Sequence, residues 1–141
     1  MNDDFNARYK RQLLLKEIGQ EGQKKILNSS VLVVGAGGLG CPALLYLSAA
    51  GVGRIGLIDF DMVDLSNLQR QILFNSDMIG KAKVSEALTV LKKLNPSVIF
   101  EIHNAVLNKE NVQDLFLKYD VILDGSDNFD TKYLINDAAV K

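Results

Sequence analysis

The sequence predicts an α/β fold with a mostly parallel sheet, and three observations support this prediction. Short apolar runs rich in β-branched residues alternate with segments of helical periodicity. One such run, Val31–Val34, leads directly into a glycine-rich turn. The chain has 141 residues, enough for one domain with a hydrophobic core. Right-handed crossovers between such strands give a Rossmann-like sheet of order three-two-one-four, with flanking helices and a helical extension at the N-terminus.

The first half of the chain is expected to contain two short helices followed by a strand, a helix and a strand. Tyr9, Leu13 and Leu14 recur at helical spacing in the N-terminal segment. The helix between the strands carries Leu44 and Leu47 on an apolar face. The expected bounds are helices Asn6–Lys16 and Gln23–Leu27, strand Ser30–Val34, helix Gly38–Ala50 and strand Arg54–Ile58.

The second half continues the alternation of helices and strands. Val84, Ala87 and Leu91 share one face of an amphipathic helix. Pro96 should end this helix, because proline disfavours the helical conformation at the residue before it. The expected bounds are helix Lys81–Leu94, strand Val98–Ile102, helix Lys109–Lys118, strand Val121–Leu123 and a last helix that begins near Asn128.

Composition excludes several classes of function. The 16 basic and 17 acidic residues are mixed along the chain, which argues against a nucleic-acid partner. No apolar run reaches the ~20 residues that a membrane span needs, and the polar N-terminal segment is unlike a secretory signal. Cys41 is the single cysteine, so an internal disulfide is impossible, and we expect it to be a packing residue in a reducing cytoplasm.

The glycine loop, residues 35–40, has the pattern Gly-x-Gly-x-x-Gly formed by Gly35, Gly37 and Gly40. Such a turn between a strand and a helix exposes backbone N–H groups at a helix N-terminus, where phosphates bind. The pattern alone is weak evidence, since a sharp turn can need glycines without any ligand. The preceding buried strand and the following apolar helix supply the context that favours a nucleotide.

Asp59 ends the second strand, about twenty residues after the glycine loop. A carboxylate at this position accepts hydrogen bonds from the ribose hydroxyls of a nucleotide. Asp61 follows two residues later, and its role is left undecided between a ligand contact and a turn residue. These features indicate a nucleotide without distinguishing ATP from a nicotinamide dinucleotide.

The segment after the second strand carries polar side chains toward the same crevice. Ser66 and Gln69 resemble a capping box, which predicts a short helix there. Asn67, Arg70 and Gln71 would then share one face, suited to phosphate oxygens. The competing interpretation is a solvated helical turn.

Spacing alone does not decide the roles of several charged residues. Lys81 and Lys83 would point in different directions on one helix, so at most one of them faces a phosphate. Asp127 either caps the last helix or holds Mg²⁺ on a triphosphate. Arg8 and Arg11 on the first helix would ordinarily form a solvated face.

Together these segments resemble the ubiquitin-activating-enzyme-like adenylyltransferases of the MoeB/ThiF/HesA family. The resemblance covers nearly the whole chain, and the SNLQRQ run after DFD is its most specific part. The matching segments are RYKRQLLL (8–15), GAGGLGC (35–41), AGVGRIGLIDFDMVDLSNLQRQILF (50–74), GKAK (80–83), LNP (94–96) and DGSDN (124–128). Such enzymes use MgATP to adenylate the C-terminal glycine of a small ubiquitin-fold sulfur carrier, and they serve molybdopterin or thiamine biosynthesis.

The resemblance implies a role for individual residues. Lys83 is selected over Lys81, and Asp127 is assigned to Mg²⁺. Arg11 is implied to reach the γ-phosphate side from the partner subunit of a homodimer. The implied site comprises Gly35, Gly37, Gly38 and Gly40 around the phosphates, Asp59 on the ribose, and Asn67, Arg70 and Lys83 on the phosphates, with Arg11, Arg70, Lys83 and Asp127 as the catalytic set.

Family members are longer than this chain, so we expect an N-terminal, ATP-binding portion of the family fold. The segment that holds the carrier tail, the sulfur-transfer cysteine and the paired Cys-x-x-Cys motifs would lie beyond Lys141, so no zinc is expected. The strand Val121–Leu123 would then form an exposed apolar edge. Two alternatives to the adenylyltransferase remain: a non-catalytic nucleotide-binding or dimerisation fragment, and an NAD-dependent oxidoreductase.

Overall fold

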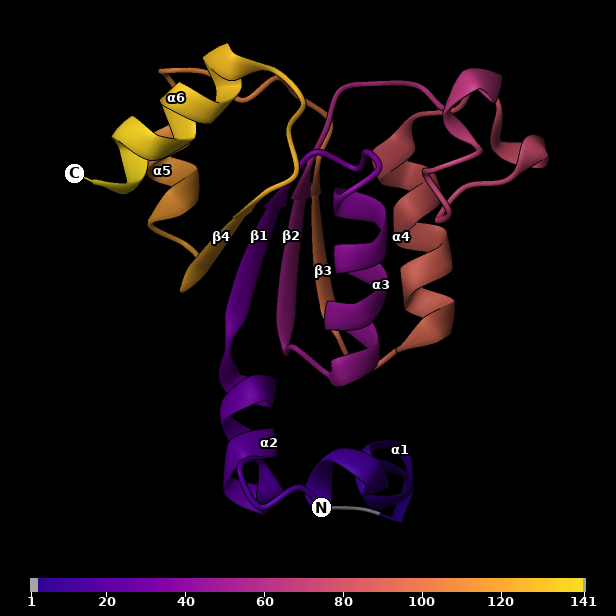
Figure 1. The fold of residues 1–141 in the computed structure, drawn as a ribbon, viewed down its shortest axis with the longest axis vertical. Helices are drawn as coiled ribbons and strands as arrows, with labels where there is room; N and C mark the ends of the chain where they lie inside the picture. Colours follow the sequence, from indigo (N-terminus) through magenta and orange to yellow (C-terminus); the bar gives the residue numbers. More distant parts are fainter. Residues whose placement is uncertain (1–2, 141) are drawn as a thin grey trace.

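The described residues form one four-stranded parallel sheet in the order β3-β2-β1-β4 (Figure 1). The computed structural model describes residues 3–140. The predicted strand order is confirmed, and all neighbouring strands are parallel. The strands are β1 (Ser30–Val34), β2 (Arg54–Ile58), β3 (Ile99–His103) and β4 (Val121–Asp124).

The helices cover both faces of this sheet. In Figure 1, α3 and α4 lie over one face, while α5 and α6 lie beside β4 and contact each other. The helices are α1 (Asp3–Leu13), α2 (Gly19–Asn28), α3 (Gly40–Ala50), α4 (Lys83–Leu94), α5 (Val112–Phe116) and α6 (Phe129–Ala139). Two short 3₁₀ turns, η1 (Leu65–Asn67) and η2 (Ser76–Met78), lie in the long connection between β2 and α4.

The central strand β1 divides the hydrophobic core into two halves. Its side chains alternate between the faces of the sheet, as strand geometry requires. Val31 and Val33 pack in the cluster that includes α3 and α4, whereas Leu32 and Val34 pack in the cluster that includes α5 and α6. Every residue of β1 is therefore buried, which explains the uninterrupted apolar run Val31–Val34 that follows Ser30.

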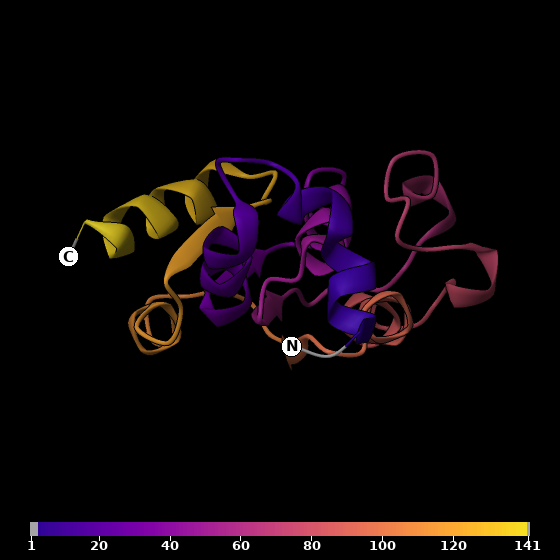
Figure 2. The same ribbon diagram turned by 90° about the horizontal axis from the view of Figure 1, so that it is seen from below.

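The N-terminal helices close the end of the sheet where the strands begin (Figure 2). Tyr9 of α1 is buried, and its hydroxyl accepts a hydrogen bond from Asn95 Nδ2 at 2.8 Å. The same Nδ2 donates to the carbonyl of Ser48 at 2.8 Å. Arg8 Nη1 also donates to the carbonyl of Leu94 at 3.0 Å, near the C-terminus of α4. The extension is thus attached to the ends of α3 and α4.

The bounds of α1 to α5 differ from the sequence prediction, and β3 and β4 each end one residue later than expected. The first helix ends at Leu13 rather than at Lys16, and α4 begins at Lys83 rather than at Lys81. The helix predicted from Lys109 starts only at Val112, because Asn108 and Asn111 hold the preceding residues in a turn. Asn108 Oδ1 accepts from the backbone N–H of Glu110 at 2.9 Å, and Asn108 N donates to Asn111 Oδ1 at 2.9 Å.

The strand β4 forms one edge of the sheet in the described part of the chain. It pairs only with β1, and Val121 is 54% exposed. Within residues 3–140, none of the helices is both long enough and apolar enough to cross a membrane.

Candidate functional site

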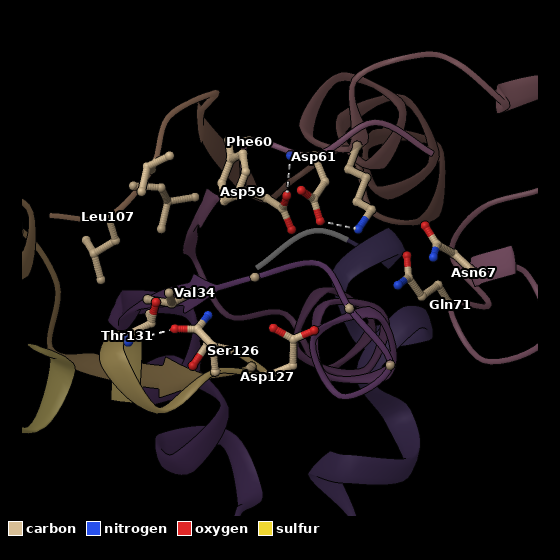
Figure 3. Close-up of a pocket in the computed structure, with 18 of the residues that line it drawn as sticks. Val34, Asp59, Phe60, Asp61, Asn67, Gln71, Leu107, Ser126, Asp127 and Thr131 are labelled. Atoms are coloured by element: carbon tan, nitrogen blue, oxygen red, sulfur yellow. Dashed lines mark hydrogen bonds and ion pairs between the residues drawn. The ribbon is translucent and has the colours of Figure 1, made fainter. Parts of the chain in front are cut away.

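A pocket of about 360 Å³ opens where the carboxyl ends of β1, β2 and β4 meet the glycine loop (Figure 3). This is the position at which open parallel sheets bind ligands. Figure 3 shows Phe60 and Leu107 at one end of the pocket and Asn67 and Gln71 at the other. The predicted site residues that line it are Gly35, Gly37, Gly38, Asp59, Asn67, Arg70, Lys83 and Asp127.

The glycine loop is shaped by backbone contacts that exclude side chains. Gly35 has φ of 90° and donates its N–H to the carbonyl of Ile58 at 2.8 Å. A Cβ on Gly40 would lie 1.9 Å from the carbonyl oxygen of Gly35. Gly40 is therefore the packing glycine that lets α3 approach β1, and it does not line the pocket.

Asp59 connects the glycine loop to the end of β2. Its Oδ2 accepts from the backbone N–H of Ala36 at 2.7 Å, and its Oδ1 accepts from the backbone N–H of Asp61 at 2.8 Å. These bonds orient the carboxylate. Each oxygen of an ionised carboxylate can accept a second hydrogen bond, so the group retains capacity for a ligand hydroxyl.

The turn after β2 begins differently from the prediction. The capping box is formed by Asp64 and Asn67, not by Ser66 and Gln69. Asp64 Oδ1 accepts from Ser66 N at 2.8 Å, while Asp64 N donates to Asn67 Oδ1 at 3.3 Å. The extended Asp64 lets η1 start one residue before Ser66. Since its oxygen is engaged, Asn67 offers its amide N–H₂ as a donor to the pocket.

Arg70 and Gln71 line the pocket with Asn67, as their spacing predicted. Arg70 is exposed, donates Nη1 to the carbonyl of Ser66 at 3.1 Å, and its aliphatic stem lies over Gly38. Gln71 is only 4% exposed, and its Oε1 is buried without a hydrogen-bond partner in the described part of the chain. A buried acceptor of this kind is costly unless a ligand or water supplies a donor.

Lys83 is the first residue of α4, and it is 4% exposed. Its Nζ forms an ion pair with Asp61 Oδ2 at 2.9 Å. Lys81 is exposed and lies outside the pocket lining. The argument from helical spacing between these lysines does not apply, because Lys81 precedes the helix and the intervening Ala82 has an extended conformation.

The loop after β4 brings Asp127 to the pocket. The structure excludes the interpretation that Asp127 caps the last helix. The cap of α6 is Asn128, whose Oδ1 accepts from Thr131 N at 2.9 Å. Asp127 is therefore not the capping residue; the next side chain takes that role because Asn128 is the last extended residue before the helix. The Asp127 carboxylate is exposed and has no hydrogen bond or ion pair within residues 3–140.

The nearby Asp124 already has hydrogen-bond and ion-pair partners within the protein. Its Oδ1 accepts from Ser126 Oγ at 2.6 Å, and its Oδ2 pairs with Lys132 Nζ at 3.2 Å. Burial raises the pKa of Asp124, but the bonds from Ser126 and Lys132 outweigh burial and hold this pKa below its ordinary value. Asp127 is thus the carboxylate of this loop that is free to meet a ligand.

No cluster of three or more His, Cys, Asp or Glu side chains suited to a metal is present between residues 3 and 140. Mg²⁺ often takes one or two carboxylates and completes its shell with phosphate oxygens and water. The single free carboxylate of Asp127 fits that mode when a phosphate is bound beside it. It does not fit a metal held by protein ligands alone.

Arg11 is the one predicted catalytic residue that lies away from the pocket. It is exposed on α1, at the opposite end of the sheet from the glycine loop (Figure 1). The apolar end of the pocket includes Phe60, Val106 and Leu107, which sequence reasoning did not find. Apolar residues in loops carry no distinctive spacing, so no signal in the sequence could have selected them.

Comparison with known proteins decides the family. The ThiF family profile matches residues 9–141 of the chain. The chain belongs to the ThiF family. This membership confirms the resemblance drawn from the sequence motifs.

Two curated proteins are about half identical to this chain over nearly its whole length. The chain is 51% identical to the adenylyltransferase and sulfurtransferase MOCS3 of Anopheles gambiae, over 99% of this chain and 32% of that protein. It is 52% identical to the probable adenylyltransferase/sulfurtransferase MoeZ of Mycobacterium tuberculosis strain H37Rv, over 95% of this chain and 34% of that protein. The chain therefore spans about a third of the length of these curated relatives.

A solved structure with a nucleotide shares the fold. The tRNA N6-threonylcarbamoyladenosine dehydratase TcdA of E. coli, in complex with ATP, matches with a TM-score of 0.84 and 26% identity. The match covers 90% of this chain and 52% of that chain. A ThiF-like fold of this kind thus binds ATP in at least one relative.

Proposed function

We propose that this chain forms the ATP-binding part of an adenylyltransferase that activates the C-terminal glycine of a ubiquitin-fold sulfur carrier. The observation that supports this most directly is the composition of the pocket. One cavity joins the glycine loop, the carboxylate of Asp59 and the cationic side chains of Arg70 and Lys83. Such a combination suits a nucleoside triphosphate, whose phosphates need several donors at once.

The nucleotide would lie across the pocket from its apolar end to its polar end. The adenine would rest against Phe60, Val106 and Leu107, and Asp59 would accept hydrogen bonds from the ribose. The phosphates would then face Asn67, Arg70 and Lys83. A dinucleotide has no γ-phosphate, so these three donors favour ATP over NAD.

The reaction requires charge compensation more than a strong base. A carboxylate oxygen of the carrier attacks the α-phosphorus of ATP, the bond from that phosphorus to the bridging oxygen of the β-phosphate breaks, and pyrophosphate leaves. The attacking C-terminal carboxylate has an ordinary pKa near ~3.5, so it is ionised at neutral pH. Arg70 and Lys83 would offset the repulsion between the anions and stabilise the charge on the departing pyrophosphate.

Mg²⁺ would be held by Asp127 together with phosphate oxygens. When bound, the ion would supply positive charge to the phosphates and help to orient them. Asp127 suits this role because its carboxylate is exposed to the pocket and makes no bond to the described residues.

The protein would act as a homodimer in the cytoplasm. Arg11 cannot reach the pocket of its own chain from the far end of the sheet, so a catalytic role for Arg11 requires a second copy. In that arrangement Arg11 of one subunit would face the γ-phosphate side of the other. The carrier would be one that delivers sulfur in molybdopterin or thiamine biosynthesis.

Calorimetric titration with MgATP and with NADH, followed by an ATP–pyrophosphate exchange assay with carrier, tests the proposal. We expect binding of MgATP and carrier-dependent exchange. Two matched pairs locate the site: Lys83→Gln against Lys81→Gln, and Asp127→Asn against Asp130→Asn. The pocket variants should lose about 10²–10³-fold in exchange rate, as is typical when a donor to developing charge is removed. The exposed controls should retain the wild-type rate.

Three other results would contradict the proposed function or the proposed phosphate site. Tight NADH binding without MgATP binding would contradict an adenylyltransferase and favour an NAD-dependent oxidoreductase. MgATP binding without exchange in the presence of carrier would favour a non-catalytic nucleotide-binding fragment. Equal losses in Lys83→Gln and Lys81→Gln would show that the phosphate site is misplaced.

A further inference from the structure

We infer that Asp61 is a positioning residue that holds the Lys83 ammonium at the wall of the nucleotide pocket. This inference rests on the proposed function, because it assigns Lys83 to the phosphates. Sequence reasoning left Asp61 undecided, and no role in the adenylation scheme above uses it. The structure pairs its Oδ2 with Lys83 Nζ at 2.9 Å.

Lys83 stands in an unfavourable place for a cation. Its side chain is 5% exposed, so its ammonium has lost nearly all of its water. It is also the first residue of α4, where the helix dipole is positive, and the cap residue Ala82 supplies no side-chain acceptor. A buried ammonium at this end of a helix needs a compensating anion. Asp61 is the carboxylate paired with it.

Asp61 is itself held in place by the backbone around it. Its N–H donates to Asp59 Oδ1 at 2.8 Å, and its carbonyl accepts from Lys83 N at 3.0 Å. Met62 and Ala82 form an antiparallel bridge beside this pair. The start of α4 is thereby joined to the end of β2 at both backbone and side chain.

These bonds form a continuous chain across the pocket. The N–H of Ala36 in the glycine loop donates to Asp59, Asp59 accepts from the backbone of Asp61, and the Asp61 carboxylate accepts from Lys83. The proposed ribose carboxylate and the proposed phosphate cation therefore share one framework. A shift of Asp61 would displace Lys83 relative to the glycine loop.

The pairing leaves Lys83 able to bind a phosphate. An ammonium has three donors, and Asp61 takes one of them. The Asp61 side chain is 51% exposed, so water screens its repulsion toward a phosphate, whereas Lys83 is deeply buried. Placement of the cation should therefore outweigh repulsion, and loss of Asp61 should weaken nucleotide binding rather than strengthen it.

A double-mutant cycle on MgATP affinity tests this inference. The variants are Asp61→Ala, Lys83→Gln and the double variant, with Asp77→Ala at an exposed site as the control. We expect Asp61→Ala to raise the Kd for MgATP by about tenfold in the wild-type background and by less than about twofold in the Lys83→Gln background. Thermal unfolding of each variant checks that it is folded. The control should bind as the wild type does.

Acetylation of lysines without nucleotide, read by mass spectrometry, gives a second measurement. Lys83 should react far more slowly than the exposed Lys81 in the wild type and should approach it in Asp61→Ala. Unchanged or tighter MgATP binding in Asp61→Ala, an equal loss in both backgrounds, or unchanged acetylation of Lys83 would each overturn the inference. A wild type that binds no MgATP would instead remove the proposed function, and the acetylation result would still decide whether Asp61 holds Lys83.

Discussion

Cys41 illustrates how a single residue near the glycine loop can be structural rather than reactive. It is fully buried in the first turn of α3, and its Sγ donates to the carbonyl of Ala36 at 3.3 Å. A helix N-terminus lowers the pKa of a thiol in many proteins. Here burial dominates and raises the pKa of Cys41 to about 11. The thiol therefore remains protonated at neutral pH and packs as a small apolar group, as its sequence context indicated.

We predict that native Cys41 does not react with a disulfide reagent such as Ellman's reagent at pH 8. Only the thiolate attacks the reagent, and both the raised pKa and the burial suppress it. When urea unfolds the protein, about one mole of thiol per mole of chain should react, since Cys41 is the single cysteine. Fast labelling of the folded protein would contradict this account.

At the scale of elements, Asp and Asn side chains cap the starts of η1, η2 and α6. Asp64 begins η1, and Asn128 begins α6. From the sequence, Ser66 and Asp127 are candidates for these caps, because Ser, Asp and Asn all suit an N-cap and the local sequence does not rank candidates one or two residues apart. The choice depends on which residue is the last in an extended conformation. By contrast, the bounds of β1 and β2 were predicted to the residue, because an apolar run between turn residues is a strong local signal.

The start of β4 is fastened to the start of β1 by one carboxylate. Asp120 Oδ2 accepts from Ser30 N at 2.8 Å and from Ser30 Oγ at 2.7 Å. These two bonds lower the pKa of Asp120. A carboxylate with a depressed pKa in the folded state stabilises the fold above its unfolded pKa of ~3.9, and this contribution disappears as the pH falls through the folded value.

We predict that Ser30→Ala lowers the free energy of unfolding at pH 7 by an amount that shrinks below about pH 4. The variant loses the hydroxyl that donates to the Asp120 carboxylate, so the pKa of Asp120 should move back toward its ordinary value. Urea unfolding of the variant and the wild type between pH 2.5 and pH 7 measures the difference. Ser97→Ala, at an exposed position, is the control. A deficit that stays constant with pH would assign the effect to packing instead.

At the scale of the whole molecule, buried polar residues join elements that are distant in sequence. Asn95 is fully buried and connects α1 to α3 and α4 through Tyr9 and the carbonyl of Ser48. In the sequence, Asn95 stood out only as the residue before a proline and as part of the LNP segment. Its second role is visible only when the N-terminal helices are in place. The same attachment fixes the direction in which α1 presents Arg11.

We predict that Asn95→Ala destabilises the protein by about 2 kcal/mol, since it leaves the buried Tyr9 hydroxyl without its donor. Tyr9→Phe should cost less, about 1 kcal/mol, because Asn95 keeps its bond to Ser48. Urea denaturation measures both, with the exposed Asn104→Ala as the matched control. An unfolding free energy for Asn95→Ala within error of the wild type would mean that α1 is not attached through this contact.

The sequence alone was enough to predict the strand order, because the alternation of strands and helices and the handedness of their crossovers limit the possible sheets. It was also enough to predict the glycine loop and the family, because both depend on short motifs. It also named eight of the residues that line the pocket as site residues, but none of the apolar side chains. The burial of Lys83 beside Asp61 and the exposure of Lys81 became visible only in the folded structure. That outcome depends on where the end of β2 meets the start of α4, two segments brought together by the fold. Contacts between such segments arise from packing of the whole domain, and no local pattern encodes them.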